Sequence, residues 1–543
     1  MQPRVPVTFS PAGETVWVEP GVTVAEAARL AGVLLAVPCA GRGLCAGCGV
    51  RVLEGALAPA DDVEACTMAR APEGVRLACR ARVTEAVDVR PLFASARVAD
   101  GSATPATPAA PRVSSGEPLA ASASGSVRSL VVGVDMGTTS VAALIVDASS
   151  GREIARGVVP NREQSFGADV LSRISSAQSG EGAALQHLAE ESVGDAIAQA
   201  AAAGRVDMAA VRRIVIAGNS AMSALLVGAD VTSLATYPFS PPAAGGPLSS
   251  DAAQRILGAE ANVEVLLVPP IAAFVGGDAL AATLAAGLVD TDAPRLLVDI
   301  GTNAELVLAL PGSLLVASTA AGPAFEGSGI SCGGPAGAGA VDRVDIEDGV
   351  VSLHAIEDAE PRWFSGAGLV SAVAALRGAG HLGADGLLVA DGPLSGHFGR
   401  DADGVLGVTL SPDGADTELR LTQLDVRALQ LAKAAVRAGI ELLLRHAGLR
   451  SADLAEVLVA GAFGAALDPA DLVELGVLPN AVMGRTRRVG NAALDGASAM
   501  ALDPALLELA SGVASGAQHV DLATEEEFGP SFMKATEFAP YEA

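Results

Sequence analysis

The chain has 543 residues, of which 50% are hydrophobic but only 3% aromatic, and its formal net charge is −27. This length predicts two or three domains, and the acidic balance argues against nucleic acid as a partner, because phosphate contacts need clusters of Lys and Arg. No apolar run is long and pure enough for a membrane-spanning helix, and no basic segment followed by an apolar one opens the chain. We therefore expect a cytoplasmic protein without a membrane partner.

Residues 1–96 have the pattern of a compact domain. Two strands are expected over residues 5–9 and 15–18, joined by a turn at residues 11–13. A helix is expected over residues 23–31, with Thr23 as its N-cap and Gly32 as its stop. A further strand over residues 49–53 follows a loop rich in cysteine and glycine.

Four cysteines of this domain have a spacing that suits iron–sulfur ligation. Cys39, Cys45 and Cys48 form a C-x5-C-x2-C run, and Cys79 follows in the sequence Arg-Leu-Ala-Cys. A [2Fe–2S] cluster needs four converging thiolates, two for each iron, and glycines let the backbone wrap closely around it. A zinc knuckle, the alternative, usually pairs two CxxC hairpins, whereas this chain has one. The first gap is one residue longer than in plant-type ferredoxins, and the domain resembles the ferredoxin-like domains that have this extra residue.

The other two cysteines, Cys66 and Cys332, fall outside this pattern and are expected to be packed, structural thiols. Residues 97–127 are rich in Ala, Ser, Pro, Thr and Gly and almost devoid of large apolar side chains, which predicts a linker. From residue 128 to residue 543 apolar strands, glycine turns and Ala/Leu-rich helices alternate, which is typical of an α/β fold.

Two similar strand–turn units occur in this α/β part. In each, a carboxylate at the end of a strand could hold a metal-bound water, and a turn of glycine and hydroxyl residues could offer N–H and O–H groups to phosphate oxygens. One D-x-G-T turn alone could be an ordinary chain reversal. Two of them predict two related lobes, over about 128–290 and about 294–543. The residues concerned are Asp135, Gly137, Thr138, Thr139 and Ser140 in the first unit, and Asp299, Gly301, Thr302 and Asn303 in the second.

Three more glycine-rich segments accompany these turns. Gly461 and Gly464 follow a buried strand and resemble an adenosine motif, where small residues let the backbone approach the base and ribose. Gly218 with Asn219, and the segment that begins at Gly322, resemble the connections at a hinge between lobes.

Hydrolysis of ATP in such a site would need Mg²⁺ on the β and γ phosphate oxygens, with Asp135 and Asp299 holding the waters of the metal ion. Glu326 is the candidate for orienting or deprotonating the attacking water, and a hinge ion pair is its alternative role. No histidine stands out as a nucleophile, and His381, like the others, is expected to face solvent.

This ordered set of motifs resembles the superfamily of acetate and sugar kinases, Hsp70 and actin (the ASKHA fold, which is ribonuclease H-like) from about residue 128 onward. Combined with the N-terminal domain, the whole chain resembles the reductive activators of corrinoid proteins in methyltransferase and O-demethylase systems. Further segments that look shared with that family are residues 161–173, 269–278 and 489–497. The resemblance implies an α+β ferredoxin-like β-grasp domain followed by a two-lobed α/β ASKHA ATPase domain.

The same resemblance implies an ATP-hydrolysing electron-transfer enzyme. One electron from the [2Fe–2S] cluster would return Co(II) to Co(I) in a corrinoid protein, with ATP and Mg²⁺ as the other cofactors. The electron donor would be a reduced ferredoxin, a flavodoxin or its reductase. Some family members have a small module before the ATPase part for which this chain has no room, so a homodimer contact cannot be carried over from it.

Other functions stay open at this point. An activator of 2-hydroxyacyl-CoA dehydratases or aryl-CoA reductases would hold a [4Fe–4S] cluster on cysteines within the ATPase part, where this chain has only Cys332. A small-molecule kinase with a redox-sensing module is a second alternative, although no feature identifies a phosphate acceptor. A non-catalytic ATP-binding protein is a third.

Overall fold

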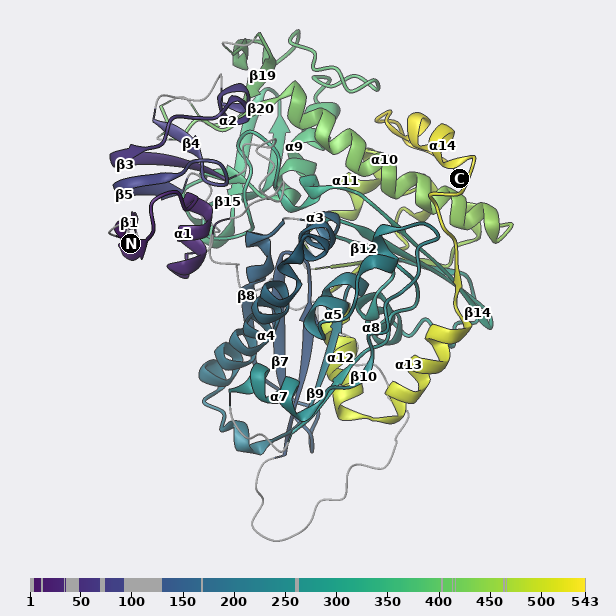
Figure 1. Cartoon of the computed structure of the whole chain (residues 1–543). Coiled ribbons are helices and arrows are strands. Elements are labelled where there is room, and N and C mark those ends of the chain that lie inside the picture. Colours follow the sequence, from purple (N-terminus) through teal and green to yellow (C-terminus); the bar gives the residue numbers. More distant parts are fainter. Residues whose placement is uncertain are drawn as a thin grey trace.

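The computed structural model describes residues 4–10, 13–33, 35, 48–68, 74–91, 129–167, 169–258, 263–401, 404–412, 414–415, 417–461, 464 and 466–542. The predicted linker and the predicted ligands Cys39 and Cys45 lie outside these residues. The described residues form one five-stranded sheet near the N-terminus, two six-stranded sheets and two small three-stranded sheets. In Figure 1 the N-terminal domain lies to one side of the larger remainder of the chain.

The N-terminal domain is a mixed sheet with a short helix against it. The strand order is β2-β1-β5-β3-β4, and β1 pairs in parallel with β5. The helix α1 (Val24–Leu30) begins where the Thr23 hydroxyl accepts a hydrogen bond from the N–H of Glu26 (3.2 Å), and Gly32 follows it with φ +69°. The predicted cap and stop are therefore confirmed. The strands are β1 (Val5–Phe9), β2 (Glu14–Val18), β3 (Gly49–Leu57), β4 (Val75–Leu77) and β5 (Val83–Pro91).

One expectation about this domain is wrong. Cys66 lies on α2 (Asp62–Thr67), and it is exposed rather than packed. The helix spans only six residues, and Glu64 is its buried member. The carboxylate of Glu64 binds the guanidinium of Arg76 (2.8 Å) and accepts from the N–H of Leu77 (2.8 Å), so this contact fixes which face of the helix is buried.

The two six-stranded sheets have the same order, which explains the two similar sequence motifs. The orders are β11-β9-β6-β7-β8 and β22-β21-β12-β13-β14, with one short strand added at an edge of each sheet. In both, three strands pair antiparallel in succession, a fourth strand pairs in parallel with the first of them, and a fifth pairs in parallel with the fourth. The strands are β6 (Leu130–Met136), β7 (Ser140–Asp147), β8 (Glu153–Pro160), β9 (Val211–Gly218), β10 (Gly246–Pro247), β11 (Glu264–Leu267), β12 (Arg295–Ile300), β13 (Ala304–Leu310), β14 (Ser313–Thr319), β21 (Glu456–Ala460), β22 (Thr486–Gly490) and β23 (Gln518–His519).

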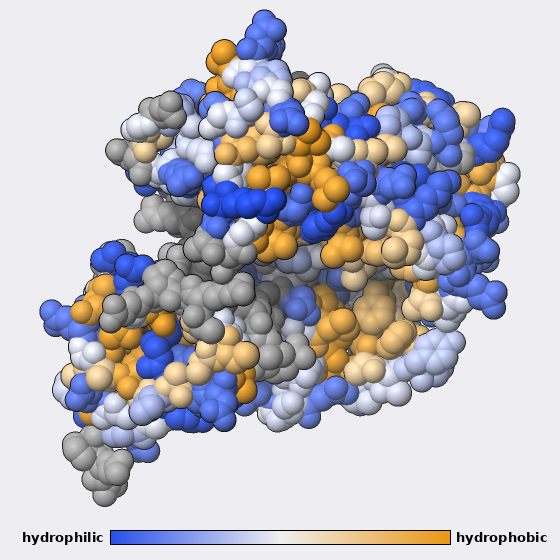
Figure 2. All heavy atoms as spheres, turned by 90° about the horizontal axis from the view of Figure 1, so that it is seen from above, coloured by the Kyte–Doolittle hydropathy of each residue, from blue (hydrophilic) through white to orange (hydrophobic). Residues whose placement is uncertain are grey.

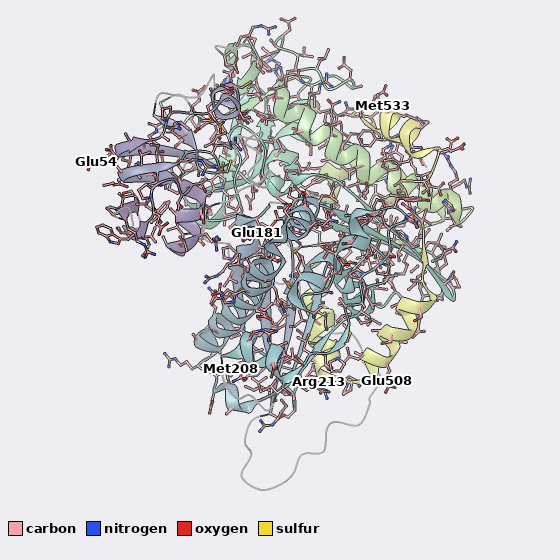
Figure 3. All side chains as sticks on the ribbon, viewed as in Figure 1. Glu54, Glu181, Met208, Arg213, Glu508 and Met533 are labelled. Atoms are coloured by element: carbon pink, nitrogen blue, oxygen red, sulfur yellow. The ribbon has the colours of Figure 1, made fainter. Side chains whose placement is uncertain are left out.

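Two helices pack closely between the sheets. A Cβ on Gly496 of α12 would lie 2.0 Å from the carbonyl oxygen of Ala281 on α8, and a Cβ on Gly133 of β6 would lie 2.2 Å from Oγ of Ser498. These contacts, which only glycine allows, bring α12 onto the first sheet although it comes late in the chain (Figure 1). Arg213 on β9, labelled in Figure 3, donates to the carbonyl of Ala501 (3.3 Å) and extends this contact. The bounds are α8 (Gly277–Ala285), α12 (Ala492–Leu502) and α13 (Ala505–Gly516).

The remaining helices cover the outer faces of the two large sheets. On the first sheet, α4 (Gly182–Gly204) packs over β7 and β8; on the second, α10 (Gln423–His446) packs over β13 and β14. The C-terminal helix α14 (Phe528–Ala535) lies along α10. The others are α3 (Val170–Ser176), α5 (Ser220–Leu226), α6 (Thr232–Ala235), α7 (Ser250–Leu257), α9 (Gly366–Gly378) and α11 (Pro469–Glu474).

The small sheets extend the second half of the chain. One contains β15 (Ala340–Glu347), β16 (Val350–Ala355) and β17 (Trp363–Phe364), and the other β18 (Phe398–Arg400), β19 (Leu406–Thr409) and β20 (Arg420–Thr422). The expectation that His381 faces solvent is wrong. Its side chain is buried, its Nδ1 lies 2.9 Å from the carbonyl of Val389, and its Nε2 accepts from the N–H of Leu394 (3.1 Å).

The surface seen in Figure 2 is mostly hydrophilic, with separate hydrophobic patches. Two exposed apolar side chains, Leu424 and Leu431, come from α10. Within the part of the chain that the structure describes, no helix has the length and apolar character needed to cross a membrane.

Candidate functional site

The two strand–turn units face one another across a single pocket. The turn after β6 is closed by a bond from the N–H of Gly137 to the carbonyl of Ser140 (3.0 Å), and the turn after β12 by a shorter-range bond from the N–H of Gly301 to the carbonyl of Asn303 (3.0 Å). The pocket is lined by Asp135, Gly137, Thr138, Thr139, Ser140, Asn219, Asp278, Asp299, Ile300, Gly301, Thr302, Asn303, Glu305, Glu326, Gly461, Asn491 and Ala493. Of the nucleotide-site residues predicted in the sequence, Gly218, Gly322 and Gly464 do not line it.

Glu326 connects the two turns. Its carboxylate accepts a hydrogen bond from the hydroxyl of Thr139 (2.8 Å) and another from the hydroxyl of Thr302 (2.5 Å). The residue lies at the end of a short 3₁₀ turn that begins after Gly322, whose own N–H donates to the carbonyl of Thr302 (2.8 Å). Burial raises the pKa of Glu326, while the two threonine bonds oppose that rise. The predicted hinge ion pair is absent from the ion pairs among the described residues.

Four more carboxyl groups converge on the pocket. Asp135 and Asp299 lie at the ends of β6 and β12, Asp278 lies in the first turn of α8, and Glu305 lies on β13. Burial raises the pKa of Asp135 to about 6, of Asp278 to about 7 and of Asp299 to about 8, and it raises that of Glu305 well above its usual range. Mutual repulsion adds to the rise at Asp278, Asp299 and Glu305. A bound cation would compensate these charges.

The carboxylates do not form a ready-made metal cage. Among the described residues, no three His, Cys, Asp or Glu side chains are close enough together to ligate a metal by themselves. Mg²⁺ commonly binds one or two carboxylates and keeps several waters and substrate phosphates. The arrangement could therefore hold a hydrated Mg²⁺ beside phosphate groups.

Asn491 brings the C-terminal part of the chain to this cluster. Its Nδ2 donates to Oδ2 of Asp135 (2.7 Å), and its Oδ1 caps α12 by accepting from the N–H of Leu494 (2.9 Å). Asn491 and Asp278 were not predicted as site residues, although both lie in segments that look shared with the family. Glu305 was not predicted either, and its signal in the sequence is an acidic residue within an otherwise apolar strand.

Gly461 lies close against the strand end that precedes the second turn. It has φ +98°, and a Cβ there would lie 2.6 Å from Oδ1 of Asp299 and 2.7 Å from the carbonyl oxygen of Ile300. Gly464 is also close-packed, because a Cβ there would lie 1.9 Å from the carbonyl oxygen of Ala460. Any larger residue at position 461 would therefore fill space beside a carboxylate that lines the pocket.

The second candidate site is in the N-terminal domain. Cys48 precedes β3 and Cys79 follows β4, two antiparallel neighbours, and the N–H of Ala78 donates to the carbonyl of Cys48 (3.0 Å). The two thiols are hydrogen-bonded to each other, which lowers the pKa of Cys48 to about 7 against the opposing effect of burial. A thiol that ionises readily and has a second sulfur beside it suits metal ligation. These two residues therefore fit half of the ligand set of a [2Fe–2S] cluster.

Together these features define an iron–sulfur protein built on an ASKHA fold. Comparisons with known proteins identify the family of this chain. Residues 7–84 match the 2Fe–2S iron–sulfur cluster binding domain, residues 130–291 match the RACo middle region, and residues 293–543 match the C-terminal, ASKHA domain of RACo.

The chain is 32% identical over 421 residues to the corrinoid activation enzyme RamQ of Eubacterium limosum, covering 75% of this chain and 70% of that protein. It is 28% identical over 360 residues to the Co(II) methylated amine-specific corrinoid protein reductase of Methanosarcina barkeri, covering 60% of this chain and 63% of the relative. Its fold matches a reductive activator for corrinoid, iron–sulfur protein with a TM-score of 0.70 at 24% identity over 98% of both chains. The chain belongs to the family of reductive activators of corrinoid proteins.

Proposed function

We propose that this protein is an ATP-dependent activator that transfers one electron to the Co(II) form of a corrinoid protein and restores Co(I). The observation that carries the proposal is that one chain joins the thiol pair of a 2Fe–2S domain to a pocket in which Glu326 contacts the turns of two matching sheets. The names of both curated relatives refer to corrinoid proteins, and one of them is a reductase that acts on Co(II).

The N-terminal domain would carry the electron. Cys39, Cys45, Cys48 and Cys79 would hold a [2Fe–2S] cluster, which supplies a one-electron redox centre. The described pair is arranged for this role, since the β3–β4 ladder fixes the backbone on both sides of the two sulfurs. A reduced ferredoxin or flavodoxin, or its reductase, would donate the electron, and Co(II) would accept it.

The pocket would bind Mg-ATP. The N–H and O–H groups of the two turns would receive phosphate oxygens, and Asp135 and Asp299 would hold the waters of Mg²⁺. Gly461 would leave room for the nucleotide beside Asp299. Glu326 would orient the attacking water, and its raised pKa brings it closer to the range in which a carboxylate acts as a general base at neutral pH.

Glu326 also suggests how ATP would act on the partner. Thr139 and Thr302 belong to different sheets, so a phosphate that competes for either hydroxyl would change the contact between the two halves. A nucleotide shifts such an equilibrium only by binding one arrangement more tightly than the other. ATP could drive the reduction only if the corrinoid protein bound these two arrangements with different affinities.

Partner-dependent ATP hydrolysis tests this proposal. The purified chain would be mixed with Co(II) corrinoid proteins from methyltransferase and O-demethylase systems, and phosphate release would be followed with and without each partner. We expect a partner to raise the rate. ATP hydrolysis that no corrinoid protein changes would contradict the proposed coupling.

A further inference from the structure

The first pocket turn is held from behind by side chains of residues 161–173. Three successive carbonyls of the turn each accept a bond from a different side chain of this segment. Asn161 donates through Nδ2 to the carbonyl of Gly137 (2.9 Å), and Arg173 donates through Nη2 to the carbonyl of Thr138 (2.5 Å). Gln164 donates through Nε2 to the carbonyl of Thr139.

These side chains are themselves fixed. Asn161 is fully buried, and its Oδ1 accepts from the N–H of Glu163 (3.0 Å). Arg173 is also fully buried; its Nε donates to the carbonyl of Gly167 (2.9 Å), and its Nη1 lies 3.6 Å from a carboxylate oxygen of Glu163. A buried charge held by several partners has little freedom to move. The segment therefore acts as a rigid support for the turn.

Holding the carbonyls fixes the direction of the amides. In a planar trans peptide, the C=O of one residue and the N–H of the next point in opposite directions. With the carbonyls of Gly137, Thr138 and Thr139 held toward residues 161–173, the following N–H groups are directed to the opposite side. The residues that carry these N–H groups line the pocket.

We infer that Asn161, Gln164 and Arg173 are positioning residues, which orient the amides of Thr138, Thr139 and Ser140 toward nucleotide phosphate. This inference rests on the proposed binding of ATP in the pocket, and it names the residues that set the affinity for the phosphate chain. None of the three side chains needs to touch the nucleotide. Successive N–H groups that point into one concavity bind anions, and preorganised amides need no rearrangement when the anion arrives.

The second turn lacks this support and serves as an internal comparison. Among the described residues, the carbonyl of Thr302 accepts from the backbone N–H of Gly322, and no side-chain donor reaches the carbonyls of Gly301, Thr302 or Asn303. The two turns follow equivalent strands of equivalent sheets. The support is therefore a feature added to the first turn, and not a consequence of the shared fold.

Gln164 offers a sharp test because it is only half-buried and sits at the edge of the support. In Gln164→Glu, a carboxylate of the same size replaces the amide that donates to the carbonyl of Thr139. Ionised, it repels this carbonyl; protonated, it can donate to it again. Gln164→Met removes this side-chain donor without adding charge, and it leaves the bond from the N–H of Asn161 to the same carbonyl (3.0 Å) in place.

Gln423→Glu is the matched control. Gln423 is likewise half-buried and donates through Nε2 to a backbone carbonyl, that of Gly386 (2.6 Å), but it lies in the second half and does not line the pocket. The same change of charge at this position reports any general loss of structure.

The measurement is isothermal titration of the full chain with AMP-PNP plus Mg²⁺, and with adenosine, at pH 8 and pH 6. Loss of one hydrogen bond predicts roughly 3- to 10-fold weaker binding of AMP-PNP to Gln164→Met at pH 8. We expect a larger loss for Gln164→Glu at both pH values, because a carboxyl group with a pKa of about 4.3 is ionised at both, with adenosine binding and Gln423→Glu unchanged. Wild-type binding of AMP-PNP by either Gln164 variant at pH 8, or an equal loss for adenosine, would overturn the inference. If the unaltered chain bound no AMP-PNP, the proposed function itself would fail.

Discussion

Thr139 and Glu326 are hydrogen-bonded at 2.8 Å although 187 residues separate them, and they come from the two halves of the chain. The same carboxylate accepts from Thr302. One buried side chain thus contacts both turns that would bind phosphate, at the point where the two sheets meet. Substitutions of Glu326 should therefore affect ATP turnover more than nucleotide binding.

Glu326→Gln should bind Mg-ATP and hydrolyse it slowly. An amide can accept from only one of the two threonines with its oxygen, and it cannot take a proton from water. Loss of a general base lowers rates by about 10²- to 10⁴-fold, so we expect a fall of that size in kcat and a smaller change in KM. Glu347→Gln, at an exposed position on β15, is the control. An unchanged kcat would show that Glu326 has no role in activating water.

Asp299 should make the stability of the metal-free protein depend on pH. Its pKa rises from about 3.9 in unfolded chains to about 8 in the fold. The folded state therefore binds more protons between these values, and stability falls as pH rises through this window, by at most about 1.4 kcal/mol per pH unit for one group. In EDTA, the unfolding temperature of the unaltered chain should fall between pH 5 and pH 8.

In Asp299→Asn this fall should be shallower, with the remaining slope coming from the other buried carboxylates. The matched comparison is Asp292→Asn, in the loop before β12. Parallel slopes for the unaltered chain and Asp299→Asn would contradict the predicted protonation of Asp299.

Gly461→Ala should abolish nucleotide binding. The new methyl group would lie 2.6 Å from Oδ1 of Asp299, on a residue with φ +98°. Gly448→Ala controls for backbone strain, because Gly448 has φ +65° with nothing within 4 Å of its added Cβ. Each change should destabilise the fold by about 1 kcal/mol or more through strain. Only Gly461→Ala should lose ATP binding by titration, and retained binding would show that the nucleotide does not approach this glycine.

Replacing Cys48 or Cys79 by Ser should remove or destabilise the iron–sulfur cluster. Each change takes away one of four thiolate ligands, which the visible absorption and EPR spectra of anaerobically purified protein would report. Cys66→Ser is the control, since Cys66 is exposed on α2. A full cluster in both the Cys48 and Cys79 variants would mean that other residues hold it.

The sequence predicted the parts of the site that follow local rules. The turns after Asp135 and Asp299 were recognisable because a carboxylate, a glycine and a hydroxyl residue follow an apolar strand in both halves. The N-cap at Thr23 was predictable from another local rule, because a threonine directly precedes the helical run. Glu326 was singled out as a candidate, but its double contact depends on how two distant turns meet.

The remaining site residues depend on tertiary packing. Asn491 reaches Asp135 because α12 packs on the first sheet, and the close contact at Gly133 that permits this has no local signature. The burial of a single polar side chain is equally hard to predict: His381 is enclosed by two backbone groups that come later in the chain.

The reduction of cobalt tests the central proposal most directly. The chain, with its cluster reduced and excess donor removed, would be mixed under anaerobic conditions with a Co(II) corrinoid protein, and Co(I) would be followed by its absorption with and without Mg-ATP. The account predicts that Co(I) appears only with Mg-ATP, at no more than one equivalent per reduced cluster. Equal formation of Co(I) without nucleotide would contradict ATP dependence, and its absence with every corrinoid protein tested would contradict the proposed electron transfer.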